Sequence, residues 1–256
     1  MNNKQIWETK YKDTGDPFHS TDKYDQELID IKVKLIQPIL RKKHNLMIDI
    51  GCGTGDFLLH EKNNFRQAIG VDFSKTMIDQ FEKKIKEQKI KTIQLYKGEA
   101  KNVPVAKEKA DFIFSYATLY YIPEIDEVIK DISRALEEGG LTVLEFGNSW
   151  SLEYLLGWIN HRLFGWSKHY CISPFKMKKL AEENNLKIIG CRKFQVIPVA
   201  SLPTVLSKFF KFIIRRKFAG IMIDEWMSNI PIINIFAYRN IYILQKLYKL
   251  DKKVIR

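Results

Sequence analysis

Cysteine is scarce in the sequence, and its placement builds no site. The three cysteines, Cys52, Cys171 and Cys191, are too few and too far apart for a disulfide framework. No Cys and His residues have the spacing of zinc ligands. We therefore predict neither a disulfide nor a bound metal.

Long apolar runs and a secretion signal are also lacking. No stretch of about 18 uninterrupted apolar residues occurs, because Lys208, Lys211 and Arg215 interrupt the most apolar region. The first 13 residues contain neither an apolar core segment nor a small-residue cleavage site. These absences predict a cytoplasmic protein, with peripheral attachment to a membrane left open by the basic region described next.

Acidic residues are missing from one part of the chain. Residues 184–223 hold eight Lys or Arg and no Asp or Glu, whereas residues 1–183 carry only +1 of the net charge of +12. A nearly neutral first part joined to a basic, aromatic region indicates an anionic partner there, either nucleic acid or a membrane surface. A solvated basic face is the alternative.

The residues that are present follow the pattern of one α/β domain. At 256 residues and 45% hydrophobic, the chain suits one large core better than two. Helical spacing over 26–43, with a break expected at Pro38, precedes the first strand. Apolar runs that alternate mostly with helical patterns predict strands at 46–50, 68–73, 92–96, 110–115 and 141–146. This alternation predicts a parallel sheet covered on both faces.

Later segments extend the same pattern. A helical pattern from Ile125 to Leu136 is expected to end at Gly139 and Gly140, because glycine readily adopts the left-handed conformation of a helix C-cap. After residue 147 the chain becomes richer in aromatic residues. Strand character returns at 186–197 and around 235–244.

The sharpest motif is the run D-I-G-C-G-T-G at 49–55, directly after an apolar strand and before a helical pattern. Its alternate glycines, Gly51, Gly53 and Gly55, let the backbone turn tightly and approach a ligand, and the following helix start presents amides to an anionic group. A dinucleotide fingerprint would need a further glycine at position 56 or 58, where the chain has Asp56 and Leu58. The motif therefore predicts a nucleotide-like ligand other than NAD or FAD.

Two acidic residues follow the next two predicted strands. Asp72 ends the run at 68–73, where a carboxylate at the sheet edge can accept both hydroxyls of a ribose. Glu99 follows the next strand, where its carboxylate or the nearby backbone could meet an adenine amino group. Each residue alone could be an ordinary loop carboxylate, but their order and spacing after the glycine motif favour a nucleoside site.

This ordered set resembles the motifs of class I S-adenosylmethionine-dependent methyltransferases over roughly residues 43–147. In that family the glycine motif wraps the methionine part of the cofactor, and the acidic residue that matches Asp72 binds the ribose. The run from Gly98 to Ala100 is similar to the family's Gly-Asp-Ala, with Glu in place of Asp. Residues 110–115 and 136–144 resemble the family's fourth strand and its fifth strand with the preceding turn.

The resemblance implies that the cofactor is S-adenosyl-L-methionine. It also implies that the segment from Trp7 to Tyr11 folds over the cofactor. The cofactor-binding residues expected in this way are Asp49, Gly51, Cys52, Gly53, Gly55, Asp72, Phe73, Met77, Glu99, Ala100, Ser115 and Tyr11.

The resemblance further implies the fold and its organisation. The fold class is α/β, a doubly wound, Rossmann-like, seven-stranded, mostly parallel sheet with an antiparallel last strand at 237–244. The single domain of residues 1–256 then divides into an N-terminal cap and helix at 1–43, a cofactor-binding core at 44–147, and insertions over the acceptor side at 148–183 and 198–235.

The candidates for catalysis lie outside the glycine motif. Methyl transfer from a sulfonium needs an in-line arrangement, and an acceptor that must lose a proton also needs a general base. Tyr116, Tyr120 and Tyr121 follow the fourth strand, where related enzymes line the acceptor side, and core packing is the alternative for them. His169 is the candidate base, so the predicted catalytic residues are His169, Tyr120 and Tyr121. Glu145 could bind substrate or make ordinary hydrogen bonds at a strand end.

Residues 201–217 predict a basic amphipathic helix, with Lys208, Lys211 and Arg215 opposite an apolar arc. Such a helix can pack on the sheet, cover the site as a lid, or lie on an anionic membrane. We rank packing or a lid first and peripheral contact with an anionic membrane next. Nucleic acid comes third, because the chain has no recognised RNA-binding motif.

The aromatic and apolar content of the insertions predicts an acceptor with a large apolar surface. The predicted function is therefore S-adenosylmethionine-dependent methyl transfer to a small or lipid-like organic acceptor. Two alternatives stay open: a non-catalytic, cofactor-binding regulatory or scaffold protein, and an RNA or protein methyltransferase.

Overall fold

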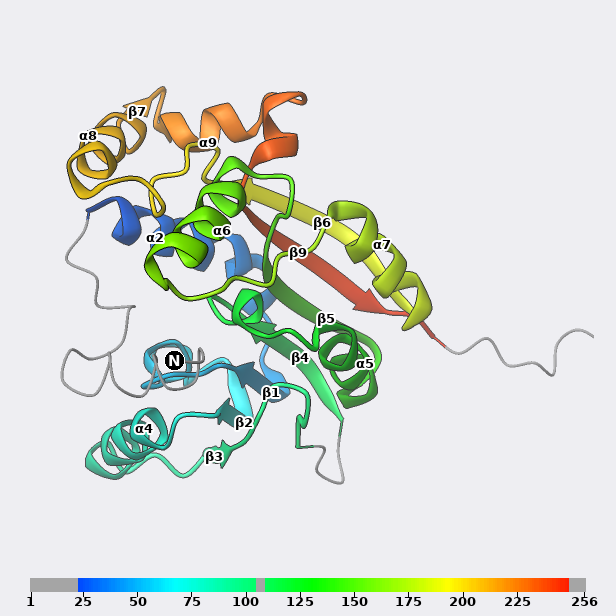
Figure 1. The fold of residues 1–256 in the computed structure, drawn as a ribbon. Helices are drawn as coiled ribbons and strands as arrows, with labels where there is room; N and C mark the ends of the chain where they lie inside the picture. The colour runs from blue at the N-terminus through cyan, green and yellow to red at the C-terminus, as the bar shows by residue number, and fades with distance from the viewer. Residues whose placement is uncertain (1–22, 105–108, 249–256) are drawn as a thin grey trace, which may run out of the picture.

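Seven strands form the central sheet of the computed structural model, which describes residues 23–104 and 109–248 (Figure 1). They are β1 (His44–Ile50), β2 (Phe65–Asp72), β3 (Ile93–Lys97), β4 (Ala110–Ser115), β5 (Leu136–Gly147), β6 (Leu186–Phe194) and β9 (Arg239–Lys246). Their order is β3-β2-β1-β4-β5-β9-β6. Strands β1 to β5 run parallel, and β9 runs antiparallel to both neighbours. The predicted doubly wound sheet with an antiparallel last strand is confirmed.

The central strands are continuous apolar runs because both faces of the sheet are covered. Every residue of β4 is buried, as are six of the seven residues of β1. Side chains alternate between two cores along β1: Leu46, Ile48 and Ile50 belong to one, and Met47 belongs to the other.

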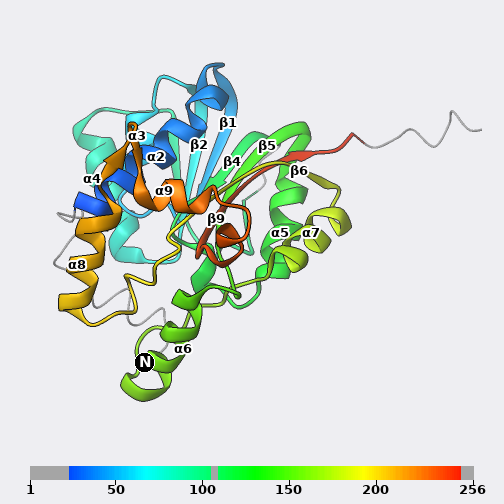
Figure 2. The same cartoon turned by 90° about the horizontal axis from the view of Figure 1, so that it is seen from above.

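Two pairs of helices cover these cores. Helices α5 (Ile125–Ala135) and α7 (Pro174–Glu183) supply apolar residues to the core of Ile48, whereas α2 (Lys23–Leu40) and α4 (Lys75–Glu87) supply the core of Met47. In Figure 2, α2 and α4 lie on one side of the sheet and α5 and α7 on the other. A five-residue helix, α3 (Asp56–His60), follows the glycine motif.

The remaining elements gather at the end of the sheet toward which β5 runs (Figures 1 and 2). They are η2 (Leu119–Tyr121), α6 (Leu152–Phe164), α8 (Thr204–Ile214), the small hairpin of β7 (Lys217–Phe218) and β8 (Ile221–Met222), α9 (Ile223–Ser228) and η3 (Ile233–Phe236). These elements come from the segments after β4 and β5 and from the connection between β6 and β9. They therefore surround the carboxyl ends of the parallel strands, where ligands of such sheets bind.

The expected break at Pro38 is wrong, because α2 continues through it to Leu40. Proline removes the hydrogen bond to the carbonyl four residues earlier, and it is costly in the middle of a helix. Here it stands in the last turn, where Ile36 and Leu40 stay fully packed. The packing of the apolar face therefore outweighs the loss of one hydrogen bond.

The expected helix end at Gly139 and Gly140 is also wrong. Helix α5 ends at Ala135, and Leu136 already pairs with Ala110 as the first residue of β5. Gly139 adopts a positive φ of 80°, and the register of β4 against β5 shifts between Ala110 and Phe112. Gly139 therefore permits an irregularity within β5, a role that glycine often has in strands.

Within residues 23–104 and 109–248, no helix is long and apolar enough to cross a membrane. The same residues contain no group of three or more His, Cys, Asp or Glu that could hold a metal ion.

Candidate functional site

The glycine motif forms a tight loop between β1 and α3. Gly51 and Gly55 adopt φ values of 77° and 80°, a region that side chains rarely enter. A Cβ on Gly51 would overlap Thr118, and one on Gly55 would overlap the ring of Phe81. Both positions therefore need glycine for conformation and for space.

Asp72 ends β2 and lies beside this loop. Its carboxylate accepts hydrogen bonds from the Gly53 amide (3.0 Å) and the Ser74 amide (2.8 Å), and the side chain is buried. Because two fixed amides hold the carboxylate, its orientation is set before any ligand arrives. This geometry suits a residue that orients the hydroxyls of a ribose.

The third strand end joins the same edge. The Gly98 amide donates to the Asp72 carbonyl (2.9 Å), so the turn after β3 lies against the end of β2. Glu99 is partly exposed, and its carboxylate is 3.7 Å from Lys101 Nζ, while Ala100 packs against the core. The structure thus brings the glycine motif, Asp72 and Glu99 together, as the sequence predicted for a nucleoside site.

The other predicted cofactor residues within the described part of the chain lie at or just after the ends of β1, β2 and β4 and in the first turn of α4. Asp49 and Cys52 are buried at the end of β1, Met77 is buried in the first turn of α4, and Phe73 is partly exposed. Ser115 is fully buried, and its hydroxyl donates to the Ile50 carbonyl (2.7 Å), so it ties β4 to β1. Tyr11 and the segment from Trp7 lie outside the described residues.

Sequence reasoning missed a lysine that braces the loop. Lys84 on α4 donates to Asp56 Oδ1 (2.7 Å) and to Thr54 Oγ1 (3.0 Å), and Thr54 itself donates to Asp56. The contact fixes the beginning of α3 from a helix that is 28 residues further along the chain. In the sequence, Lys84 is one of several lysines on a solvent-facing helix, so no signal distinguished it.

The predicted catalytic residues also come together. His169 lies with its ring centroid 5.5 Å from that of Tyr120 and 5.1 Å from that of Tyr121. Its Nδ1 is hydrogen-bonded to the hydroxyl of Tyr238 (2.7 Å), a residue that the sequence did not single out. These four rings, referred to below as the aromatic cluster, stand beside the ends of β4 and β9.

Burial controls the protonation of the aromatic cluster. Desolvation, with a smaller contribution from Arg239, lowers the pKa of His169 to about 4, so its imidazole is neutral at pH 7. Desolvation raises the pKa of Tyr120 to about 12 despite the opposing effect of Arg239. Both groups are therefore uncharged near neutral pH, which suits contact with an apolar or neutral acceptor.

A buried network of charged residues around Glu145 contacts the aromatic cluster. Glu145 on β5 accepts hydrogen bonds from Lys32 Nζ (2.7 Å), Arg239 Nη1 (2.6 Å) and the Ala117 amide (2.9 Å). Burial raises the pKa of Glu145, but Lys32 and Arg239 outweigh it and lower the pKa to about 2. Because Glu145 is fully buried by these partners, its interactions are those of a strand end and not of a substrate ligand.

Arg239 connects the network to the aromatic cluster. It donates to the Tyr120 hydroxyl (3.3 Å) and to Gln195 Oε1 (2.8 Å), and its guanidinium lies 5.7 Å from the Tyr120 ring centroid. Lys32 and Arg239 lie 113 and 94 residues from Glu145 in sequence, so no local pattern could have linked the three.

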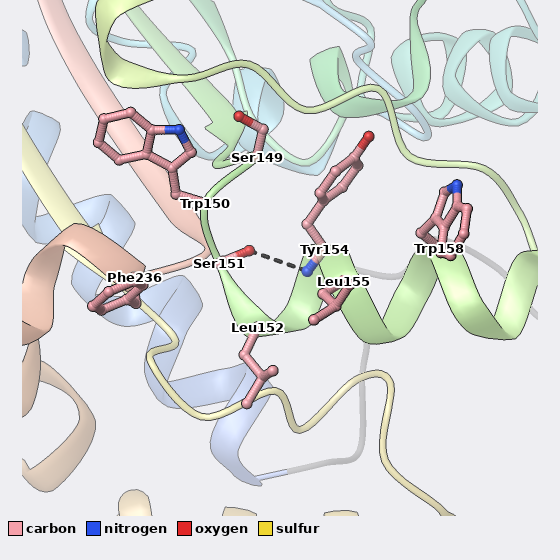
Figure 3. A pocket seen from close by; sticks show the side chains of 8 residues that line it. All are labelled: Ser149, Trp150, Ser151, Leu152, Tyr154, Leu155, Trp158 and Phe236. Carbon is pink, nitrogen blue, oxygen red and sulfur yellow. Dashed lines mark hydrogen bonds between the residues drawn. The ribbon is translucent and has the colours of Figure 1, made fainter.

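An apolar pocket is formed by the segment that follows β5 (Figure 3), and the Asn148 amide at the start of this segment donates to the Tyr238 carbonyl (2.7 Å). The pocket has a volume of about 600 Å³ and is lined by residues that follow β5, belong to α6 or belong to η3: Ser149, Trp150, Ser151, Leu152, Tyr154, Leu155, Trp158 and Phe236. In Figure 3, Tyr154 and Trp158 project from the same side of α6. The Ser149 amide, at the start of this lining, donates to the Ile172 carbonyl (3.2 Å), so the pocket begins beside the segment that follows His169.

The strand order, the glycine loop and the anchored carboxylate define an α/β fold whose strand ends suit a nucleoside-like ligand. Comparison with known proteins narrows this class. Residues 48–144 match the family described as Methyltransferase domain. A demethylmenaquinone methyltransferase from Lactobacillus johnsonii is 32% identical over 117 residues, which are 44% of this chain and 48% of the relative. The chain thus spans about half the length of this curated relative.

Solved structures share the fold over most of the chain. Magnesium protoporphyrin IX methyltransferase from Synechocystis has a TM-score of 0.62 at 14% identity, covering 95% of this chain and 99% of its own. Geranyl diphosphate C-methyltransferase from Streptomyces coelicolor has a TM-score of 0.60 at 15% identity, covering 91% and 86%. The matched domain and these similar proteins support the prediction from the motifs that the chain is a class I S-adenosylmethionine-dependent methyltransferase.

Proposed function

We propose that the protein transfers the methyl group of S-adenosylmethionine to a small, lipid-like organic acceptor. The observation that carries the proposal is the apolar pocket that follows the carboxyl end of β5, where the backbone at Asn148 is hydrogen-bonded to Tyr238 of the aromatic cluster. The lining of the pocket is mostly aromatic and aliphatic, which favours an acceptor with a substantial apolar part. Two of the similar proteins are named for small organic acceptors, demethylmenaquinone and geranyl diphosphate.

The residues of the glycine loop fit the proposed cofactor. The tight turn at Gly51 and Gly55 would let the backbone approach the methionine part, and Asp72, held by the Gly53 and Ser74 amides, would bind the ribose hydroxyls. Glu99 or the backbone beside it would contact the adenine. When bound, the cofactor supplies an electrophilic methyl group on a sulfonium, so this chain mainly has to position an acceptor in line with it.

The aromatic cluster would hold and deprotonate the acceptor. Tyr120 and Tyr121 would contact its reacting end. His169 would take a proton at Nε2 in the tautomer in which Nδ1 carries the hydrogen and donates it to the Tyr238 hydroxyl oxygen. With a pKa of about 4, the imidazole is always available in its neutral form at pH 7 but is a weak base. It therefore suits an acidic hydroxyl, such as that of a phenol or enol, better than an alcohol.

We extend the proposal to the organisation of the chain. Residues 44–147 would bind the cofactor, and residues 148–183 and 198–235 would form the acceptor side. Within the second group, α6 lines the pocket, whereas α7 packs on β6 as one of the helices that cover the sheet.

The first experiment is calorimetric titration of the purified protein with S-adenosylmethionine and S-adenosylhomocysteine, with NAD as the control ligand. We expect both sulfur ligands to bind and NAD not to bind. Transfer of labelled methyl from the cofactor into an organic-solvent extract of lipids would then be measured. Label in the organic phase supports the proposal. Cofactor binding with no transfer to lipids, protein or RNA supports a regulatory protein instead, and label in RNA or protein overturns the lipid-like acceptor.

A further inference from the structure

Helix α6 has the reverse of an ordinary amphipathic pattern. Its buried residue is Glu153, whereas Leu155, Leu163 and Phe164 are 52%, 69% and 68% exposed. The Glu153 carboxylate accepts hydrogen bonds from Gln195 Nε2, the Ala200 amide and the Ser201 hydroxyl. The helix is thus held to the protein by polar contacts, and its apolar side chains face outward.

Helix α8 also leaves large apolar side chains exposed, although it packs on the core of Met47 through Ile214 and Phe210. Ile214 is its fully buried residue, whereas Val205, Phe209 and Phe212 are 80%, 57% and 46% exposed. Lys211, on the expected polar side, instead points to the protein and pairs with Asp25 of α2 (3.2 Å). Of the predicted apolar arc, Phe210 packs against the core of Met47, whereas Val205, Leu206 and Phe209 are exposed, so packing covers only part of this arc.

The two helices are joined through the segment that precedes α8. The segment that leads into α8 runs along α6, where the Asn160 side chain donates to the Ser201 carbonyl (2.9 Å) and the Ser201 hydroxyl contacts Glu153. Most of the large exposed apolar side chains come from this part of the chain: of the 22 in the described residues, 19 lie between positions 150 and 236, and of these only Phe175 and Ile189 are on α7 and β6. Isolated exposed apolar residues are ordinary, but a concentration of this kind marks an interaction surface.

Basic residues accompany the exposed apolar residues. Between positions 204 and 222 the chain has five Lys or Arg and no Asp or Glu. Lys208, Arg215 and Arg216 have no acidic partner in the described part of the chain, while Arg215 and Arg216 lie over the ring of Phe212 at 5.2 and 4.5 Å. On α6, Arg162 lies over the ring of Trp158 at 5.2 Å. Aromatic and aliphatic side chains mixed with arginine and lysine are typical of surfaces that enter the headgroup region of an anionic bilayer.

We propose that α6, α8 and the β7–β8 hairpin dock the protein on the surface of a membrane that contains anionic phospholipids. The apolar side chains would enter the boundary between headgroups and acyl chains, and Lys208, Arg215 and Arg216 would contact lipid phosphates. Leu152, Leu155 and Trp158 belong both to this surface and to the pocket wall, so the pocket opens where the bilayer would lie. An apolar acceptor could then pass from the bilayer to the pocket without crossing water.

The test is sedimentation with sucrose-loaded vesicles, in the absence of cofactor and acceptor, so that the result is independent of methyl transfer. The vesicles are of pure phosphatidylcholine or of phosphatidylcholine with about one third phosphatidylglycerol. We expect binding to the anionic vesicles, weakened by high salt. The triple variant Lys208→Gln, Arg215→Gln and Arg216→Gln should bind about 100-fold more weakly, since each basic residue near such a surface contributes about fivefold.

A matched control removes the same number of charges elsewhere. Lys91, Lys97 and Lys130 are exposed residues on other parts of the fold, and their replacement by Gln should leave vesicle binding within about twofold of wild type. The double variant Phe209→Ser and Phe164→Ser should also lose binding, whereas Ile189→Ser on β6, which is half exposed, should not. Circular dichroism and thermal unfolding establish that each variant is folded.

Three outcomes overturn the proposal. One is absence of wild-type binding to the anionic vesicles. Another is equal weakening by the two triple variants, which would indicate a general effect of net charge. The third is a stable dimer in size-exclusion chromatography that the Phe209→Ser and Phe164→Ser variant abolishes without any change in vesicle binding, which would assign the surface to a second copy of the chain.

Discussion

Asp72 offers the most direct test at the scale of single residues. The variant Asp72→Asn keeps the shape of the side chain but loses the charge that strengthens hydrogen bonds to ribose hydroxyls, each of which contributes about 1.5–3 kcal/mol when the acceptor is ionised. We expect the Kd for S-adenosylmethionine to rise between about 10-fold and 100-fold by calorimetry. Asp79→Asn on the exposed side of α4 is the control, and an unchanged Kd for the Asp72 variant would remove the ribose assignment.

Substitution of Gly55 tests whether the loop needs glycine there for steric reasons. Gly55 and Gly165 both adopt a positive φ, but a Cβ would overlap Phe81 at position 55 and would meet nothing within 4 Å at position 165. Gly165→Ala should therefore cost only the conformational strain of about 1 kcal/mol. Gly55→Ala should cost about 2–4 kcal/mol, because overpacking adds to the strain. Urea unfolding measures both, and equal losses would contradict the steric role of Phe81.

His169 tests the proposed proton transfer through its pH dependence. The pKa of His169 is lowered to about 4, so the neutral base is present above pH 5 and is lost as the pH falls through 4. Protonation of His169 should therefore not change turnover between pH 8 and pH 5. The imidazole resonances of His169, followed by NMR, should titrate near pH 4. His169→Gln should reduce kcat by about 100-fold or more with little change in the Kd of the cofactor. An acid limb near 6.5 in the wild-type profile would be inconsistent with this assignment.

At the scale of elements, α6 is expected to determine how the acceptor binds. Trp158→Ala and Tyr154→Ala remove aromatic surface from the pocket wall without touching the glycine loop. We expect each variant to raise the KM of the acceptor by about tenfold, the equivalent of about 1.4 kcal/mol of lost contact, with the Kd of the cofactor unchanged. Trp226→Ala, an exposed tryptophan on α9 outside the pocket lining, is the matched control. Equal KM values in all three variants would exclude the pocket as the acceptor site.

The elements also show which parts of the fold sequence reasoning can reach. Strands β1 and β4 were predictable because burial on both faces requires a continuous apolar run. The glycine loop and Asp72 were predictable because neighbouring strand ends bring nearby motifs to one edge. The start of β5 was not, since Leu136 fits the helical spacing of α5 as well as the strand that it joins.

The exposure of the apolar side chains of α6 and α8 could not be predicted from the sequence, for a different reason. Apolar periodicity predicts that a helix has an apolar face, but it carries no information about what covers that face. The roles of three charged residues, Glu153, Lys211 and Lys84, depend on partners far away in the chain. Their residue types alone do not distinguish them from solvated glutamates and lysines. Such roles depend on long-range contacts and become visible only in the fold.

At the scale of the whole molecule, the buried network of Glu145 with Lys32 and Arg239 links α2, β5 and β9. The pKa of Glu145 is lowered to about 2, so its stabilising contribution is complete above its unfolded pKa of about 4.5 and is lost as the pH falls toward 2. This difference corresponds to about 3 kcal/mol. Urea unfolding of the wild type between pH 6 and pH 3 should therefore show declining stability.

Glu145→Gln should lower the free energy of unfolding at pH 7 by about 3–5 kcal/mol, because it leaves two buried cations without a counter-charge. The free energy of unfolding of this variant should also fall less steeply between pH 6 and pH 3 than that of the wild type. Glu87→Gln, which removes an exposed partner of Lys83, should change stability by less than about 0.5 kcal/mol. If the two glutamine variants unfold alike, the network does not hold these elements together.

The place of β9 has a consequence for the order in which the molecule can be built. This strand is the last of the sheet in the described chain, yet it lies between β5 and β6, and β6 pairs with no other strand. While the chain is being synthesised, β1 to β5 can assemble as they emerge, but β6 must wait without a hydrogen-bonding neighbour until residues 239–246 arrive. Arg239, the first residue of that strand, also carries the contact to Tyr120, so the acceptor side is completed in the same late step that closes the sheet.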